Sequence, residues 1–164
     1  EIKDLIRGII REWFSNKVLG NDLRSILQDL VSLNLKEFEK KFRVLVEEMF
    51  SYMDVGKNTA ENFYHAFVLG ILVGLKDTYY VNSNRESGFG RYDIMLEPKD
   101  KNGNSFIMEF KVMENMEEKT IEDTVENAKK QIEEKRYEEN LKERGFTNIT
   151  KMVYAFNSII REII

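Results

Sequence analysis

The sequence predicts an α/β protein in which an N-terminal helical segment precedes one helix, three strands, a second helix and a last strand. Three observations lead to this prediction. Apolar residues recur at three- and four-residue spacing in the first third of the chain. Alternating, β-branched segments follow between turn-forming residues, and a long charged segment precedes the last of them. We expect a mixed sheet flanked by helices, because the first three strands can form an antiparallel meander and the long helix lets the fourth return parallel.

Three helices are expected in the first third of the chain. The first has its apolar stripe in residues 2–14, and a break at residues 20–22 (Gly-Asn-Asp) separates it from the second. The third begins after Asn34, which forms a capping-box pattern with Glu37. These helices carry almost no candidate chemistry, so we expect a packing unit. Their apolar stripes, within residues 2–50, could instead supply the interface of a homo-oligomer.

A domain boundary is expected at residues 54–58, where Gly and two turn-forming residues follow the helical third. This divides the chain into a helical connector, residues 1–54, and a second domain, residues 55–164. Thr59 can cap a helix that runs from Ala60 to about residue 75.

The second domain is expected to contain four strands and one long helix. A helix of high charge density is predicted from Thr120 to Arg144, and Gly145 is expected to end it. The expected strands are residues 78–83, 91–97, 105–112 and 149–156.

Composition excludes several classes of protein. Of the 164 residues, 42% are hydrophobic, which is enough for a core and excludes a disordered chain. The absence of cysteine excludes a disulfide scaffold, a zinc-thiolate site and a cysteine nucleophile. The longest uncharged stretch, Asn62–Leu75, is too short to span a bilayer, so we expect a cytoplasmic protein with no membrane partner. The net charge of −4 gives no support to a general nucleic-acid coat, but an enzyme needs only a local groove of the right sign.

Three charged residues of the predicted strands are expected to converge. Glu109 and Lys111 are two positions apart, so they share one face of their strand while Phe110 points to the other. If the second and third strands pair across the turn at residues 98–103, Asp93 lies opposite Glu109.

Two carboxylates beside one ammonium suit a hard divalent cation such as Mg²⁺, which prefers oxygen ligands. The lysine could then hold a phosphate or position an attacking water. The alternative is a solvated strand face with a cross-strand ion pair, because this spacing occurs often by chance in a chain of 33% charged residues.

Glu61 on the helix before the sheet, Asp93, the Glu109-Phe110-Lys111 tripeptide and Gln131 on the later helix together resemble the PD-(D/E)XK nuclease superfamily. The resemblance covers about residues 55–157 and implies a restriction-endonuclease-like αβββαβ core. Additional segments are similar to a bacterial family in which a nuclease-like domain follows a predicted AAA-type ATPase: residues 61–65, 83–88, 90–93, 131–132 and 135–137. The resemblance therefore implies an upstream ATPase domain of the same polypeptide, although this chain has no G-x-x-x-x-G-K-[ST] loop.

The resemblance also implies a role for each matching residue. Asp93 and Glu109 would bind Mg²⁺ or Mn²⁺, with the Phe110 backbone carbonyl as a further ligand. Lys111 would position the water and stabilise charge on the phosphate in the transition state. Glu61 would hold a metal-bound water or a second metal.

Supporting roles are expected for three more residues. Gln131 would act from the outer shell of the site. His65 lies one helical turn after Glu61 and could orient it or contact the phosphate, with a hydrogen-bonded histidine at a core edge as the alternative. Arg91 could line the phosphate path, with a surface ion pair as the alternative. One departure from the family's pattern is that Tyr92, and not proline, precedes Asp93.

The sequence thus predicts a metal-dependent phosphodiesterase that acts on nucleic acid, with DNA as the expected substrate. The alternative is a non-catalytic binding or interaction module that has kept the nuclease fold within a larger ATPase-containing protein. Lys135, Arg136 and Tyr137 could meet a nucleic-acid backbone, but a solvated helix face is the favoured interpretation, since the surrounding segment is acidic.

Overall fold

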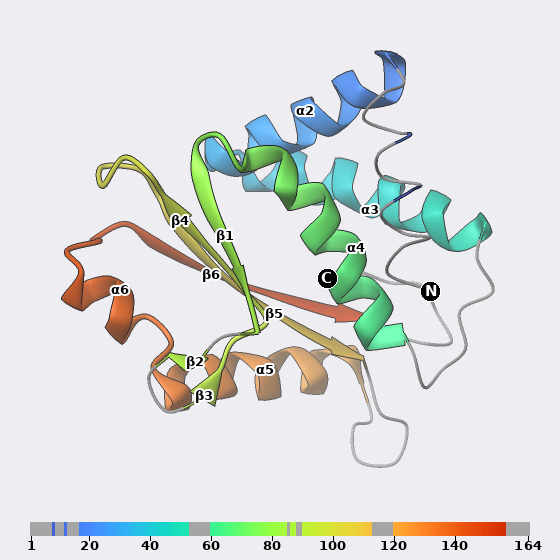
Figure 1. Ribbon diagram of the computed structural model, residues 1–164. Helices are drawn as coiled ribbons and strands as arrows, with labels where there is room; N and C mark the ends of the chain where they lie inside the picture. Colours follow the sequence, from blue (N-terminus) through green and yellow to red (C-terminus); the bar gives the residue numbers. More distant parts are fainter. Residues whose placement is uncertain are drawn as a thin grey trace. The chain divides into compact units, whose positions relative to one another are not determined.

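The chain folds into two compact units, Glu1–Leu75 and Lys76–Ile164. The structure is a computed structural model (Figure 1). It describes residues 8, 12, 17–52, 60–84, 86–87, 90–112 and 120–156.

The first unit is helical, as the apolar spacing predicts. Its helices are α2 (Lys17–Val31), α3 (Leu35–Tyr52) and α4 (Ala60–Leu72), and a short 3₁₀ turn, Val73–Leu75, follows α4. Helices α2 and α3 pack against each other. On each helix, the buried hydrophobic residues recur at helical spacing and form one face. These residues are Leu23, Ile26, Leu27, Leu30, Phe38, Phe42, Leu45 and Val46.

The predicted break at residues 20–22 is wrong, because α2 runs through it without interruption. Glycine in a helix costs about 1 kcal/mol relative to alanine. Gly20 is buried, one turn before the buried Leu23, and we infer that packing of this face outweighs the propensity cost. The other expected features of this part lie largely outside the described residues: the helix of residues 2–14, of which Gly8 and Glu12 are described as helical, and the boundary at 54–58.

The second unit is built on a four-stranded mixed sheet of order β1-β4-β5-β6. Its strands are β1 (Tyr79–Ser83), β4 (Ile94–Pro98), β5 (Ser105–Val112) and β6 (Ile149–Phe156). The pairs β1–β4 and β4–β5 are antiparallel, and β5–β6 is parallel. The meander and the parallel return of the last strand are therefore confirmed. Figure 1 shows helix α5 (Ile121–Lys135) along one face of this sheet.

The second strand differs from its prediction, because β4 begins only at Ile94. Gly90 and Arg91 form a separate strand, β3, which pairs with β2 (Glu86–Ser87) outside the main sheet. Between the two strands, Tyr92 turns into the core and is 4% exposed. The predicted strand is thus interrupted just before its second half.

The predicted long helix is also interrupted. Helix α5 begins with a capping box, in which Thr120 and Asp123 exchange side-chain to backbone hydrogen bonds. It ends at Lys135, because Arg136 adopts the left-handed conformation (φ 49°). This turn allows the next residue, Tyr137, to enter the core, where it is 1% exposed.

A short helix, α6 (Glu139–Glu143), completes the segment, and Gly145 ends it as predicted. Gly145 has φ 87°, its amide donates to the Lys142 carbonyl and the Phe146 amide donates to the Leu141 carbonyl. This is a Schellman motif, with Phe146 and Leu141 supplying its hydrophobic contact in one core cluster.

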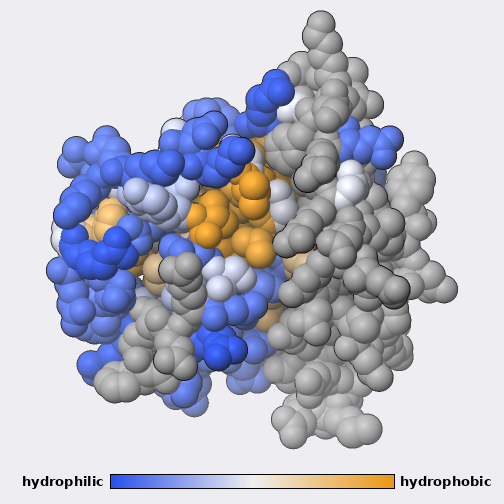
Figure 2. Space-filling view, viewed as in Figure 1, coloured by the Kyte–Doolittle hydropathy of each residue, from blue (hydrophilic) through white to orange (hydrophobic). Residues whose placement is uncertain are grey.

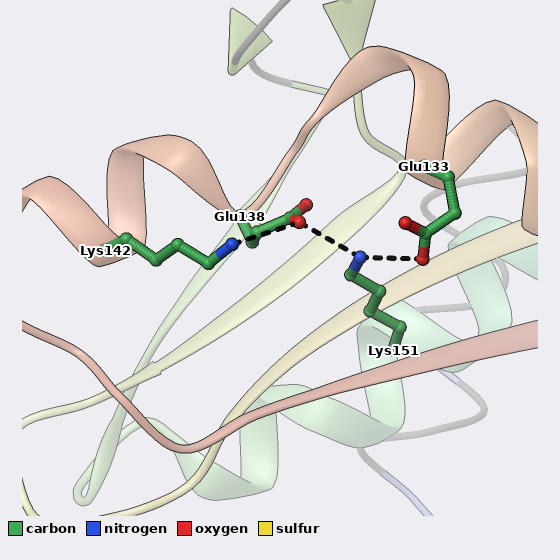
Figure 3. Close-up of polar contacts among 4 residues, drawn as sticks. All are labelled: Glu133, Glu138, Lys142 and Lys151. Atoms are coloured by element: carbon green, nitrogen blue, oxygen red, sulfur yellow. Dashed lines mark hydrogen bonds and ion pairs between the residues drawn. The ribbon is translucent and has the colours of Figure 1, made fainter.

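The sheet face covered by α5 and α6 contributes residues to a hydrophobic core and to an ion-pair network. The core cluster consists of Tyr92, Met95, Ile107, Ile132, Tyr137, Leu141 and Phe146. Lys151 on β6 bridges Glu133 of α5, at 2.9 Å, and Glu138, at 3.1 Å, and Lys142 also pairs with Glu138 (Figure 3). These contacts tie the last strand to both helices.

The face of the molecule drawn in Figure 2 is largely polar, apart from a hydrophobic group of atoms near its centre. On the face drawn in Figure 2, most of the coloured atoms are hydrophilic. None of the described helices has the combination of length and apolar character that crossing a membrane requires.

Candidate active site

Asp93 is held at the point where β4 meets β5. Its backbone carbonyl accepts a hydrogen bond from the Asn84 amide, at 3.0 Å, and its Oδ2 accepts one from the Phe110 amide, at 2.8 Å. Backbone pairing of β4 with β5 ends at Ile94 opposite Met108. Extending this register by one residue places Asp93, which directly precedes β4, opposite Glu109 on β5, as expected from the sequence. The Asp93 carboxylate therefore continues the strand pairing with its side chain.

Glu109 is a buried carboxylate in the middle of β5, only 1% exposed. Its Oε1 accepts a short hydrogen bond from the Gln131 Nε2 of α5 and lies 3.6 Å from the Lys111 Nζ. Lys111 is one-third exposed, so its ammonium can reach solvent while it neutralises the carboxylate. These contacts place Glu109 and Lys111 on the α5 face of the sheet. Phe110 points to the opposite face, where its ring stacks on Tyr154 at 5.1 Å.

The alternative of a solvated strand face does not describe this arrangement. Burying a carboxylate is costly unless its charge is paired and hydrogen-bonded, and Glu109 has both an amide donor and an ammonium. Burial and these two partners make Glu109 a candidate for a functional residue, a role that burial alone does not establish, since the buried Glu97 is paired in the same way.

The pKa of the Tyr137 hydroxyl is affected by both carboxylates, Asp93 and Glu109. Burial raises the pKa of its hydroxyl above the ordinary value of 10.0. A hydrogen bond from Gln131 lowers the pKa, and the negative charges of Glu109 and Asp93 raise it. Both carboxylates thus contribute to the electrostatic environment of one buried hydroxyl. The strand register, extended by one residue from Ile94 and Met108, is what places Asp93 and Glu109 on the same side of the sheet.

The donor set fits a divalent cation in part. Asp93 and Glu109 supply hard carboxylate oxygens at neighbouring register positions, which suits Mg²⁺ or Mn²⁺. Among the residues that the structure describes, no group of three His, Cys, Asp or Glu side chains is close enough together to hold a metal ion. The pair would therefore need further oxygen ligands, which water, phosphate or the Phe110 carbonyl can provide.

The remaining expected site residues have different outcomes. Glu61 belongs to α4, but its side chain lies outside the described residues. His65 is half-buried on the same helix, in the first compact unit, and its role stays a prediction. Arg91 is exposed on β3, and its backbone carbonyl accepts a hydrogen bond from the Tyr137 hydroxyl, at 2.8 Å. Gln131 contacts Glu109 directly, and its supporting role in a metal site stays a prediction.

Sequence reasoning missed the place of Tyr137. The favoured interpretation put it with Lys135 and Arg136 on a solvated helix face, and this is wrong for Tyr137, although the other two residues are exposed. The signal was weak, because only the left-handed turn at Arg136 takes Tyr137 out of the helical register. An aromatic residue in an acidic, otherwise polar segment was the available indication.

Fold and site together define a class of protein. A helix, three meandering strands, a helix and a parallel strand, with an aspartate and a Glu-x-Lys motif side by side, form a restriction-endonuclease-like core with its candidate active site. The family model described as the PD-(D/E)XK nuclease superfamily matches residues 59–164, more than half of the chain. The chain therefore belongs to the PD-(D/E)XK nuclease superfamily. No curated protein and no solved structure gives a significant match.

Proposed function

We propose that this chain is a Mg²⁺- or Mn²⁺-dependent nuclease that hydrolyses phosphodiester bonds in DNA. The observation that carries the proposal is the buried Glu109, held by Gln131 and Lys111 beside the anchored Asp93. A nuclease fold supports a phosphodiesterase in general, and the particular residues, metal and substrate are the proposed part.

In the proposed reaction, water attacks the phosphorus in line and the 3′- or 5′-oxygen leaves. A bound divalent cation would supply an activated water and offset the negative charge on the phosphate. Asp93 and Glu109 would hold the cation through carboxylate oxygens, and Glu61 is proposed as a further ligand from α4. The Lys111 ammonium would orient the water and stabilise the charge that develops on the phosphate oxygens.

The neighbouring groups keep these residues in position. The Phe110 amide fixes the Asp93 carboxylate, and Gln131 fixes Glu109. Since the Lys111 side chain is one-third exposed, its ammonium is available to a phosphate that approaches from solvent. His65 and Arg91 are proposed to contact the substrate.

The wider setting of the chain is also a proposal. Resemblance of residues 55–157 to a bacterial family supports an upstream AAA-type ATPase domain in the same polypeptide. The boundary near residue 55 is supported by the start of the family match at residue 59. Limited proteolysis would test this boundary, since we expect cleavage within residues 54–58.

The test is cleavage of labelled single- and double-stranded DNA, and of RNA, by the purified chain with Mg²⁺, Mn²⁺ or EDTA. We expect metal-dependent cleavage of DNA that falls by roughly 10²–10³-fold in Lys111→Ala and in Asp93→Asn. Matched controls are Lys101→Ala and Asp77→Asn, which remove exposed charges of the same sign at the end of β1, β4 and β5 opposite to Asp93.

Absence of cleavage by the folded wild-type chain with every metal would contradict the enzyme proposal. The alternative is then a binding module, for which Glu109→Gln should leave the affinity for DNA or for a partner unchanged.

A further inference from the structure

Tyr137 has no part in the proposed reaction, yet it lies at the centre of the contacts around the two carboxylates. It follows the left-handed residue Arg136 at the end of α5 and is 1% exposed. Its ring meets the Tyr92 ring edge-on, with centroids 6.3 Å apart. Packing against Tyr92, which directly precedes Asp93, gives the ring one fixed position beside the site.

The Tyr137 hydroxyl forms two hydrogen bonds, one as donor and one as acceptor. It donates to the backbone carbonyl of Arg91, at 2.8 Å, and accepts from Gln131 Nε2, at 3.2 Å. The same Gln131 amide donates to Glu109 Oε1. A side-chain amide carries two N–H groups, so Gln131 can serve both acceptors at once. A continuous chain of hydrogen bonds therefore joins the backbone two residues before Asp93 to the Glu109 carboxylate.

Close packing supports this chain from a second direction. A Cβ added at Gly90 would lie 3.2 Å from the Tyr137 ring and 2.9 Å from the Lys135 side chain. The β2–β3 ribbon thus lies directly against the tyrosine ring. Because of this contact, the position of the segment leading into Asp93 depends on the position of Tyr137.

We propose that Tyr137 is a positioning residue that holds Asp93 and Glu109 at the separation a divalent cation requires. The inference rests on the proposed function, because it assumes that these two carboxylates bind the metal. Mg²⁺ accepts little departure from octahedral geometry, whereas larger cations tolerate more. Residues that hydrogen-bond to metal ligands typically change metal affinity 10–100-fold when they are replaced.

The test is Mn²⁺ binding to the intact chain, measured by titration calorimetry for wild type, Tyr137→Phe and Asp93→Asn. Tyr137→Phe keeps the buried ring and removes only the hydroxyl. We expect the Kd for Mn²⁺ to rise about 10-fold in Tyr137→Phe. The matched control is Tyr154→Phe, which removes a hydroxyl from a buried tyrosine on the opposite face of the sheet and should leave the Kd within about 2-fold.

A second readout separates positioning from general destabilisation. The metal concentration that gives half-maximal cleavage should rise in Tyr137→Phe, while cleavage at saturating Mn²⁺ should return to near the wild-type rate. If Tyr137→Phe does not fold, Gln131→Met breaks the same hydrogen-bond chain from α5. We then expect the same weakening of Mn²⁺ binding.

The outcomes distinguish the two proposals. If the wild-type chain binds Mn²⁺ only through an intact Asp93, an unchanged Kd in Tyr137→Phe, or in Gln131→Met where Tyr137→Phe does not fold, overturns the positioning role alone. If the wild-type chain does not bind Mn²⁺, or if Asp93→Asn binds Mn²⁺ with the same Kd as the wild-type chain, the proposed metal site is overturned, and the positioning role with it.

Discussion

The ion pair between Arg144 and Glu97 is expected to make a measurable contribution to stability. Glu97 lies on β4 and is 5% exposed, and the Arg144 guanidinium donates one hydrogen bond to each of its carboxylate oxygens. Glu97 raises the pKa of Arg144 through its hydrogen bonds and its charge. Arg144→Ala would leave Glu97 as a buried carboxylate without its cation.

The expected loss follows from the different exposure of the two partners. Breaking a fully buried pair costs about 3–5 kcal/mol, whereas an exposed pair contributes about 0–1 kcal/mol. The Arg144 side chain is half exposed while the Glu97 side chain is 6% exposed. Solvent screening therefore reduces the upper range, and we expect Arg144→Ala to lower the free energy of unfolding by about 2 kcal/mol. The melting temperature should fall by about 4–8 °C.

Urea unfolding at neutral pH measures this change. Glu143→Ala, an exposed substitution in the adjacent helical turn, is the matched control and should change stability by less than about 0.5 kcal/mol. In a Glu97→Gln background, Arg144→Ala should cost less, because the buried charge is gone. A loss in Arg144→Ala no larger than that of the control would refute the reasoning, as would equal losses in both backgrounds.

Three further predictions concern stability. Burial raises the pKa of Glu138, but hydrogen bonds from its own amide, Lys151 and Lys142 outweigh it, so the pKa lies below 4.5. Its contribution is therefore present above the unfolded pKa and lost as the pH falls through the folded value, and Glu138→Gln should flatten the acid limb of a stability–pH curve. Gly145→Ala should lower the free energy of unfolding in urea by about 1 kcal/mol, because alanine is strained at the φ of 87° that Gly145 adopts. No clash adds to this cost, since an added Cβ meets no atom within 4 Å. Leu33→Gly should instead stabilise by about 0.5–1 kcal/mol, and an unchanged urea midpoint would contradict this, since Leu33 has φ 58° at the same position of a Schellman motif after α2.

Much of the candidate site was predictable because strand geometry is regular. Once Pro98 and Gly103 mark the turn between two strands, counting back places Asp93 beside Glu109, and alternation puts Glu109 and Lys111 on one face. The observed register confirms this count. What alternation could not predict is that the shared face is buried, because burial depends on α5 lying over it.

The order of the main helices and strands was determined by the sequence alone, whereas the β2–β3 ribbon and the division of the long helix into α5 and α6 were not. Apolar periodicity, turn residues and the spacing between strands specify which segments are helical or extended, and these are local properties of the chain. Tertiary packing decided where the elements end. Helix α2 continues through Gly20 because its buried face outweighs a local propensity of about 1 kcal/mol.

The same reason explains Tyr137. Nothing local requires the helix to stop at Lys135, but the left-handed turn at Arg136 allows a large aromatic side chain to leave solvent and join the core between Tyr92 and Ile132. Burying such a ring favours folding by about 2–3 kcal/mol, more than the cost of one left-handed residue. The sequence therefore specifies the main helices and strands. The contacts between Tyr137, Gln131 and Glu109 form only when α5 and the residues after it pack against the sheet that carries Glu109.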